Sequence, residues 1–181
     1  ESRSEVLAAL LAAAAHVEAP CSQGKTPLMH AGEAGHVAAC MLLVEARASV
    51  VSETLEGETV LHVVSRCGDS TLIMRMLQQR ADLAAQDHDG WTPLHEAARW
   101  SAEAVEALCR ARADVRARSR DGETALHVAI EGYDEVGACR ELLEWLSDPQ
   151  AADIDGETAL HVAVRRGHGE VCRLLLSRRA E

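Results

Sequence analysis

The stretch Gly-Glu-Thr-Ala-Leu-His-Val-Ala, residues 122–129, recurs along the chain with small changes. Near-copies begin at Gly24, Gly57, Gly90 and Gly156, so the steps between successive glycines are 33, 33, 32 and 34 residues. A self-similar period of this length is typical of a solenoid, in which each copy packs only on its neighbours. We therefore expect one continuous array and not a closed globular domain.

Each copy is expected to open with a tight turn and a capped helix. The glycine accepts a positive φ without steric cost, and in three copies it follows an aspartate, as in Asp89-Gly90. The threonine two positions later, such as Thr92, is placed to cap a helix with its hydroxyl oxygen. Pro27 and Pro93 then stand at the first helical position, where a missing N–H does no harm.

Two helices are predicted in each copy. The first is short and built from small residues, and a glycine such as Gly35, Gly68 or Gly167 often ends it. The second carries apolar residues at i, i+1, i+4 and i+5, which form one buried stripe. In the third copy, for example, that stripe contains Ala104, Val105, Leu108 and Cys109. The 32-residue step predicts a shortened turn between its two helices.

The recurring phrase resembles the ankyrin repeat, whose signature is Thr-Pro-Leu-His-x-Ala at a period near 33. The resemblance covers nearly the whole chain and implies an all-α solenoid with β-turn or short-hairpin connections. It implies a single array, 1–181. We expect a half copy and five full copies at approximately 1–22, 23–55, 56–88, 89–120, 121–154 and 155–181. The half copy rests on the apolar stripe Val6, Leu7, Leu10 and Leu11, so we expect a piece of a longer product.

The resemblance also implies a non-enzymatic protein-interaction module, with no catalysis or cofactor of its own. Members of the family bind partners in a concave face formed by the turn tips and the exposed side of the first helices. Carried over by slot, that face is lined by Lys25, Glu33, Leu55, Glu58, Arg66, His88, Trp91, Arg99, Trp100, Arg120, Glu123, Glu131, Ile154, Glu157, Arg165 and Arg166.

Two tryptophans of the third copy are the expected centre of that face. Trp91 occupies a slot that is charged in the other full copies, and Trp100 stands at the end of the first helix beside Arg99. Tryptophan and arginine are the residue types that most often dominate interface energies. The alternative is that Trp100 folds back and fills the shortened turn behind it.

Charge and length exclude several classes of partner. The net charge of −11 disfavours binding to nucleic acid or to an acidic membrane surface, and no run of 18 apolar residues predicts a membrane span. The turn tips are mostly acidic, whereas the far ends of the first helices carry Arg66, Arg99, Arg165 and Arg166. Such a field orients a partner more than it adds affinity.

The histidines and cysteines fit the scaffold better than a metal or catalytic site. His62, His95, His127 and His161 keep the period, and the resemblance implies that they hydrogen-bond the turns between copies. Acid pairs such as Glu56/Glu58 also keep the period, which favours exposed, solvated carboxylates. Asp87-His88-Asp89 is too local for a complete metal site, so no metal is expected.

Six cysteines do not predict disulfides here. Cys40, Cys109, Cys139 and Cys172 occupy slots of the buried stripe and are expected to be buried thiols, whereas Cys21 and Cys67 fall where exposure is expected. Free thiols indicate a reducing intracellular compartment, with the cytoplasm preferred over a nucleus or an organelle.

The turn after the second helix carries an unusual row of residues. The family usually has glycine there, in the left-handed conformation, but this chain has Arg47, Arg80, Arg112, Leu146 and Arg179. Helix capping explains arginine in such a position, and the sharper reading is a basic row for an acidic partner. Two alternatives to the interaction module also stand. One is a structural subunit held in an assembly by its ends and convex side, and the other is a regulatory array of a longer enzyme.

Overall fold

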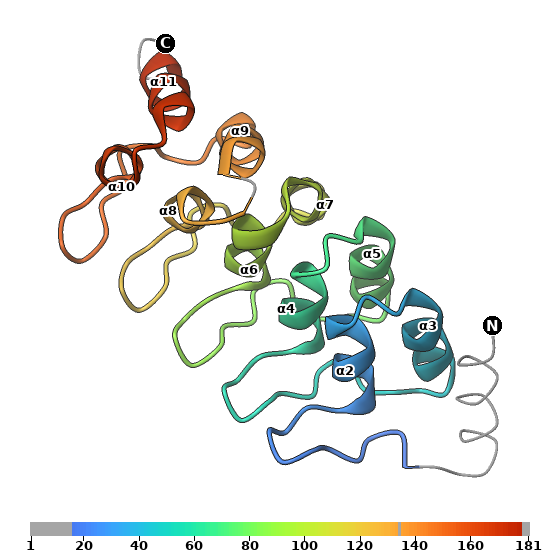
Figure 1. Ribbon diagram of the computed structural model, residues 1–181. Coiled ribbons are helices and arrows are strands. Elements are labelled where there is room, and N and C mark those ends of the chain that lie inside the picture. The colour runs from blue at the N-terminus through green and yellow to red at the C-terminus, as the bar shows by residue number, and fades with distance from the viewer. Residues whose placement is uncertain (1–15, 134, 179–181) are drawn as a thin grey trace.

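The computed structural model describes residues 16–133 and 135–178. Within them ten helices, α2 to α11, form two rows, and the turns that connect consecutive copies all project to the same side of the array (Figure 1). These residues form no strand, although isolated β-bridges join Glu53 to Thr59 and Ala152 to Thr158. The expected all-α repeat solenoid with short turn connections is confirmed. The helix expected from the stripe Val6 to Leu11 lies outside the described residues.

The first helix of each copy begins at the repeated threonine. These helices are α2 (Pro27–Glu33), α4 (Val60–Ser65), α6 (Pro93–Trp100), α8 (Ala125–Ile130) and α10 (Ala159–Arg166). In four of them the threonine and the histidine three residues later form a reciprocal capping box. In the first copy Met29 replaces that histidine, and Thr26 alone accepts the backbone N–H of Met29.

The second helices form the other row and contribute the apolar stripe. They are α3 (Val37–Glu45), α5 (Ser70–Gln78), α7 (Ala102–Arg110), α9 (Glu135–Glu144) and α11 (Gly169–Arg178). Leu72, Leu108 and Leu142 from this row are 0% exposed, as the stripe predicts. The core is therefore a continuous layer between the two rows, in which the first helices of consecutive copies pack on one another and, from α5 onward, so do the second helices.

The repeated histidine joins consecutive copies. The Nε2 atom of His62 lies 2.9 Å from the carbonyl oxygen of Trp91, and His95 and His127 make the equivalent bonds to Glu123 and Glu157 at 3.2 Å. Their Nδ1 atoms accept the threonine N–H, so Nε2 is the nitrogen that donates to the carbonyl.

The last histidine of this slot behaves differently. His161 is exposed and keeps its Nδ1 bonds to Thr158, but within the described residues it makes no bond to another copy. The predicted role between copies is therefore confirmed for His62, His95 and His127 and not for His161.

Residues with left-handed backbone occur at the turn tips and after the second helices. Gly90 has φ 78°, and a Cβ added to it would lie 2.9 Å from the backbone nitrogen of Arg120, so the turn requires glycine. After the second helices, Arg47, Arg80, Arg112 and Leu146 have φ between 64° and 71°, which confirms the conformation expected for that slot. Arg179 lies outside the described residues.

A single residue, Ser101, separates the helices of the third copy. It ends α6, and its hydroxyl then accepts the N–H of Ala104 as the N-cap of α7. The shortened turn predicted from the 32-residue step is confirmed.

None of the six cysteines, all of which lie in the described part of the chain, forms a disulfide, and three of the four in the stripe are buried. Cys40, Cys109 and Cys139 are buried, and burial raises the pKa of Cys40 to about 11 and that of Cys109 to about 12. The burial expected for Cys172 is wrong, since it is only partly buried on α11, which packs mainly on α9 and α10. No described helix is long and apolar enough to cross a membrane.

Candidate functional site

The turn tips are joined to one another by backbone hydrogen bonds. The N–H of His88 donates to the carbonyl of Glu56 at 2.9 Å, and that of Arg120 donates to Asp89 at 2.8 Å. Leu55 and Ile154 make the equivalent bonds to the tips before them. The predicted residues Leu55, His88, Arg120 and Ile154 therefore share one register, and their side chains are exposed along one row of tips.

Asp87 belongs to the same turn and supports it. Its Oδ1 atom accepts the N–H groups of Asp89 at 2.9 Å and Trp91 at 2.8 Å. The carboxylate considered above as a metal ligand is thus used to shape the turn.

Side chains eight residues apart pair between each turn and the end of the first helix. Lys25 contacts Glu33 at 2.8 Å, Glu58 contacts Arg66, and Glu157 contacts Arg165. In the third copy the pair is Trp91 and Arg99, whose guanidinium lies over the indole at 5.1 Å from the ring centre. The pairing was not recognised from the sequence, although the complementary charges at i and i+8 were a signal for it.

The fourth copy breaks this pattern because both of its partners are acids. Glu123 and Glu131 carry the same charge and do not pair. Glu131 instead lies 2.5 Å from Arg166 of the next copy. Burial, and then the charge of Glu131, raises the pKa of Glu123 above its ordinary value. The i+8 pairing therefore gives Glu123 no cationic partner, unlike Glu58 and Glu157.

Arg66 links the second and third copies and is already occupied by protein carboxylates. It contacts Glu58 and lies 3.1 Å from Glu96, and both acids are only 8% exposed. Burial raises the pKa of Glu96, and the nearby guanidinium opposes that rise. The expectation that Glu58 is a solvated carboxylate is wrong, because its ion pair with Arg66 draws it under the surface.

Trp91 is less exposed than we expected for a residue at the centre of the binding face. Its indole is half-buried between Arg99 and His95, with ring centres 6.1 Å apart in the second pair, and its carbonyl receives the bond from His62. Part of this tryptophan is thus committed to the junction between copies.

Trp100 stacks on Tyr133, a residue that the sequence reasoning missed. The ring centres are 4.6 Å apart at an interplanar angle of 17°, and Trp100 is 40% and Tyr133 76% exposed. The N–H of Tyr133 donates to the carbonyl of Arg99 at 2.8 Å and fixes the two rings together. Trp100 does not fold back into the turn behind it.

The signal for Tyr133 was its slot. Three other copies end their first helix with a left-handed glycine there, at Gly35, Gly68 and Gly167, and the chain holds one tyrosine. Because Ser101 is the only residue between α6 and α7, Trp100 stays at the end of α6 where Tyr133 of the next copy reaches it.

A family model described as Ankyrin repeats (3 copies) matches residues 46–119 and 101–181. No curated protein matches the chain.

Proposed function

Because the chain belongs to the ankyrin-repeat family, whose arrays are generally protein-interaction modules, we propose that it binds a partner protein through its concave face. That face consists of the turn tips and the exposed side of the first helices α4, α6, α8 and α10. Binding there needs no catalytic group and no cofactor, since the contacts of side chains supply the affinity.

The observation that carries this proposal is the exposed stack of Trp100 on Tyr133. Two large rings held in one geometry offer apolar area that loses little conformational entropy when a partner covers it. Tyrosine and tryptophan are also enriched among the residues that dominate interfaces. We therefore move the centre of the interface from Trp91 and Trp100 to Trp100 and Tyr133, with Arg99 and Trp91 beside it.

The charges around this centre favour a basic partner segment. The arginines Arg66, Arg165 and Arg166 are neutralised by carboxylates of the chain itself. Exposed acids at the turn tips, including Asp89 and Asp121, are left facing solvent, so negative charge dominates the face. A partner that places lysine or arginine near Glu123 and an apolar side chain on the rings satisfies both features.

Alanine substitutions at the aromatic pair test the proposal. The intact chain first captures its partner, and the dissociation constant of the purified complex is then measured by calorimetry for Trp100→Ala and Tyr133→Ala. We expect each change to weaken binding by about tenfold or more, because hot-spot truncations cost about 2 kcal/mol. Trp145→Ala is the matched control, since Trp145 is also 40% exposed but lies beyond the end of α9.

Circular dichroism separates a loss of contact from a loss of fold. The helical signal of both variants should equal that of the unmodified chain. A partner that binds Trp100→Ala and Tyr133→Ala as tightly as the unmodified chain would refute the concave-face centre.

A second candidate function is that of a subunit held within a larger assembly. The observation in its favour is apolar exposure on the last copy, where Val164 is 66% and Leu176 51% exposed. Sedimentation of the purified chain tests it, because this role predicts association that Val164→Ser and Leu176→Ser abolish. A monomer at all concentrations would contradict it.

A further inference from the structure

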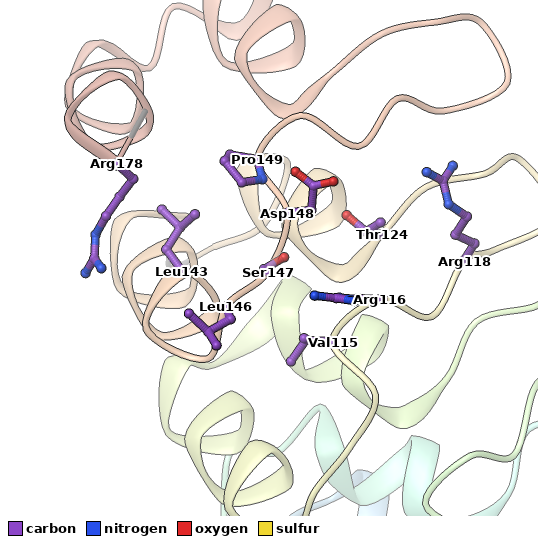
Figure 2. A pocket seen from close by; sticks show the side chains of 10 residues that line it. All are labelled: Val115, Arg116, Arg118, Thr124, Leu143, Leu146, Ser147, Asp148, Pro149 and Arg178. Atoms are coloured by element: carbon purple, nitrogen blue, oxygen red, sulfur yellow. The ribbon is translucent and has the colours of Figure 1, made fainter. Parts of the chain in front are cut away.

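A groove with a cavity volume of about 580 Å³ lies where the chain leaves the second helices of the third and fourth copies. Leu143 of α9, Leu146 and Pro149 form one wall, and Val115 of the preceding copy faces them (Figure 2). Its volume falls within the range of sites that hold a ligand or a peptide side chain, roughly 300–1,000 Å³. It shares no residue with the concave face.

A buried hydroxyl without a partner lies in this groove. Ser147 is 4% exposed, and its Oγ atom is shielded from solvent yet makes no hydrogen bond to any described residue. A hydroxyl buried in this state has lost its hydrogen bonds to water without replacing them, so a bound acceptor or donor would stabilise it. The groove is the open space beside it.

The preceding copies have no hydroxyl at the position of Ser147. The same slot holds Ala48, Ala81 and Ala113 in the three preceding copies, and all four residues donate their N–H to the carbonyl five positions earlier. The backbone at Ser147 is thus the ordinary one, and only the hydroxyl differs. Nothing in the packing of the other copies requires it.

Three arginines and one acid surround the groove. Arg118 donates to the carbonyls of Gly122 and Ala152, and Arg178 lies 4.0 Å from Glu144. Arg116 is different, because its guanidinium makes no hydrogen bond or ion pair with the rest of the described chain. Figure 2 shows it pointing toward Ser147 across the groove.

The acid, Asp148, is partly used by the loop. One of its oxygens accepts the N–H of Gln150 at 2.8 Å. The groove is therefore a basic place on a chain whose net charge is −11, with an unsatisfied hydroxyl and aliphatic walls. Charge complementarity selects an anion with an apolar neighbour as the occupant.

We propose that this groove binds an acidic segment of a partner protein. One carboxylate of the segment accepts hydrogen bonds from the Arg116 guanidinium and the Ser147 hydroxyl, and a neighbouring aliphatic side chain packs on Leu143, Leu146 and Pro149. The carboxylate satisfies Ser147 and pairs Arg116 at the same time. The site is independent of the concave face, so it stands whether or not that face binds its own partner.

A peptide titration followed by NMR tests the site. The probe is an acetylated and amidated pentapeptide with glutamate between two leucines, added to the isotope-labelled intact chain. We expect saturable shifts of the amides of Arg116, Ser147 and Gln150. The same peptide with glutamine for glutamate should bind about tenfold more weakly, because it lacks the charge-assisted hydrogen bonds.

Two variants separate binding from folding. Arg116→Gln should weaken the glutamate peptide about tenfold, while Arg140→Gln, an exposed arginine of α9 outside the groove, should leave its affinity unchanged. Ser147→Ala restores the residue of the other copies, so the unfolding midpoint should hold or rise while peptide affinity falls about threefold or more. If Ser147 had only a structural role, its replacement would not lower peptide affinity while keeping or raising the unfolding midpoint.

Each of three results would overturn the proposal. One is the absence of a saturable shift at the groove up to about 10 mM glutamate peptide. Another is equal affinity for the glutamate and glutamine peptides. The third is an Arg116→Gln variant that binds the glutamate peptide as tightly as the unmodified chain.

Discussion

At the scale of single residues, His62, His95 and His127 each make two kinds of contact, of which His95 is the example. Its Nδ1 atom helps to cap its own helix, and its Nε2–H reaches the carbonyl of the next copy. The bond at Nδ1 requires the neutral ring, because only an unprotonated nitrogen accepts a hydrogen bond, and burial favours the same form by lowering the pKa of His95 to about 4. The period of the histidines is therefore explained by structure, without a catalytic role.

The exchange His95→Met, which copies the residue of the first repeat, should lower the free energy of unfolding by about 2 kcal/mol near pH 7. The pKa of His95 is about 4 in the native state against the ordinary 6.5. Below pH 6.5 the ring is protonated in the unfolded chain but stays neutral in the native chain until the pH nears 4. The stabilisation from His95 is therefore lost as the pH falls toward 4.

Urea unfolding of both proteins at about pH 7.5 and about pH 5 measures the effect. The difference between them should shrink at the lower pH, because only the unmodified chain carries the titrating ring. A difference that stays constant between the two values would show that His95 contributes through packing alone.

At the scale of elements, both rows of helices contribute buried side chains to the core, and the second helices do so through one repeated stripe. Helix α7 shows this stripe, since it packs between α5 and α9 and its Leu108 is 0% exposed. Ser101 ends α6 and begins α7, so the two helices keep one fixed relation. Trp100, the last residue of α6, is therefore held in place beside this junction.

Truncation of a side chain in the stripe tests this burial. We expect Leu108→Ala to lower the free energy of unfolding by about 2–5 kcal/mol, because it leaves a cavity between three helices. Leu176→Ala on α11 is the control, since that side chain is 51% exposed and its loss should cost less than about 1 kcal/mol. Equal losses in chemical denaturation would mean that the assigned register of the helices is wrong.

At the scale of the whole molecule, stability passes from copy to copy through contacts between neighbours. Helix contacts, histidine bonds and tip-to-tip hydrogen bonds each join one copy to the next. The first full copy lacks the histidine bond, because Met29 stands in its slot. In such an array, local opening is expected where a junction is weakest.

Met29→His should strengthen that junction. The new ring can cap at Thr26 and donate to the carbonyl of Glu58, in the manner of His62 and Trp91, for a gain of about 1 kcal/mol. Hydrogen exchange should slow for the amides of α2, with little change in α10. Uniform slowing in both helices would contradict opening at individual junctions.

The sequence predicted the parts of the structure that keep the period, since each repeated residue acts through its own turn or its nearest neighbour. The threonine caps follow from local chemistry and the shortened turn at Ser101 follows from spacing, whereas the left-handed arginines follow from the resemblance to the family. Contacts between different slots were not predictable in this way. Tyr133 meets Trp100 only because consecutive copies are stacked, and the depth of Glu58 depends on where Arg66 folds.

The tip-to-tip hydrogen bonds use the same donor slot and the same acceptor slot at each of the four junctions from Gln23 to Ile154. A copy added by duplication of one period would therefore form the same tip-to-tip hydrogen bonds with the copies before and after it. Trp100 and Tyr133 come from consecutive copies, so a copy inserted between them would pull the rings apart. A copy added at any other junction would leave the two rings in contact, so the length of the array can change without changing this stack.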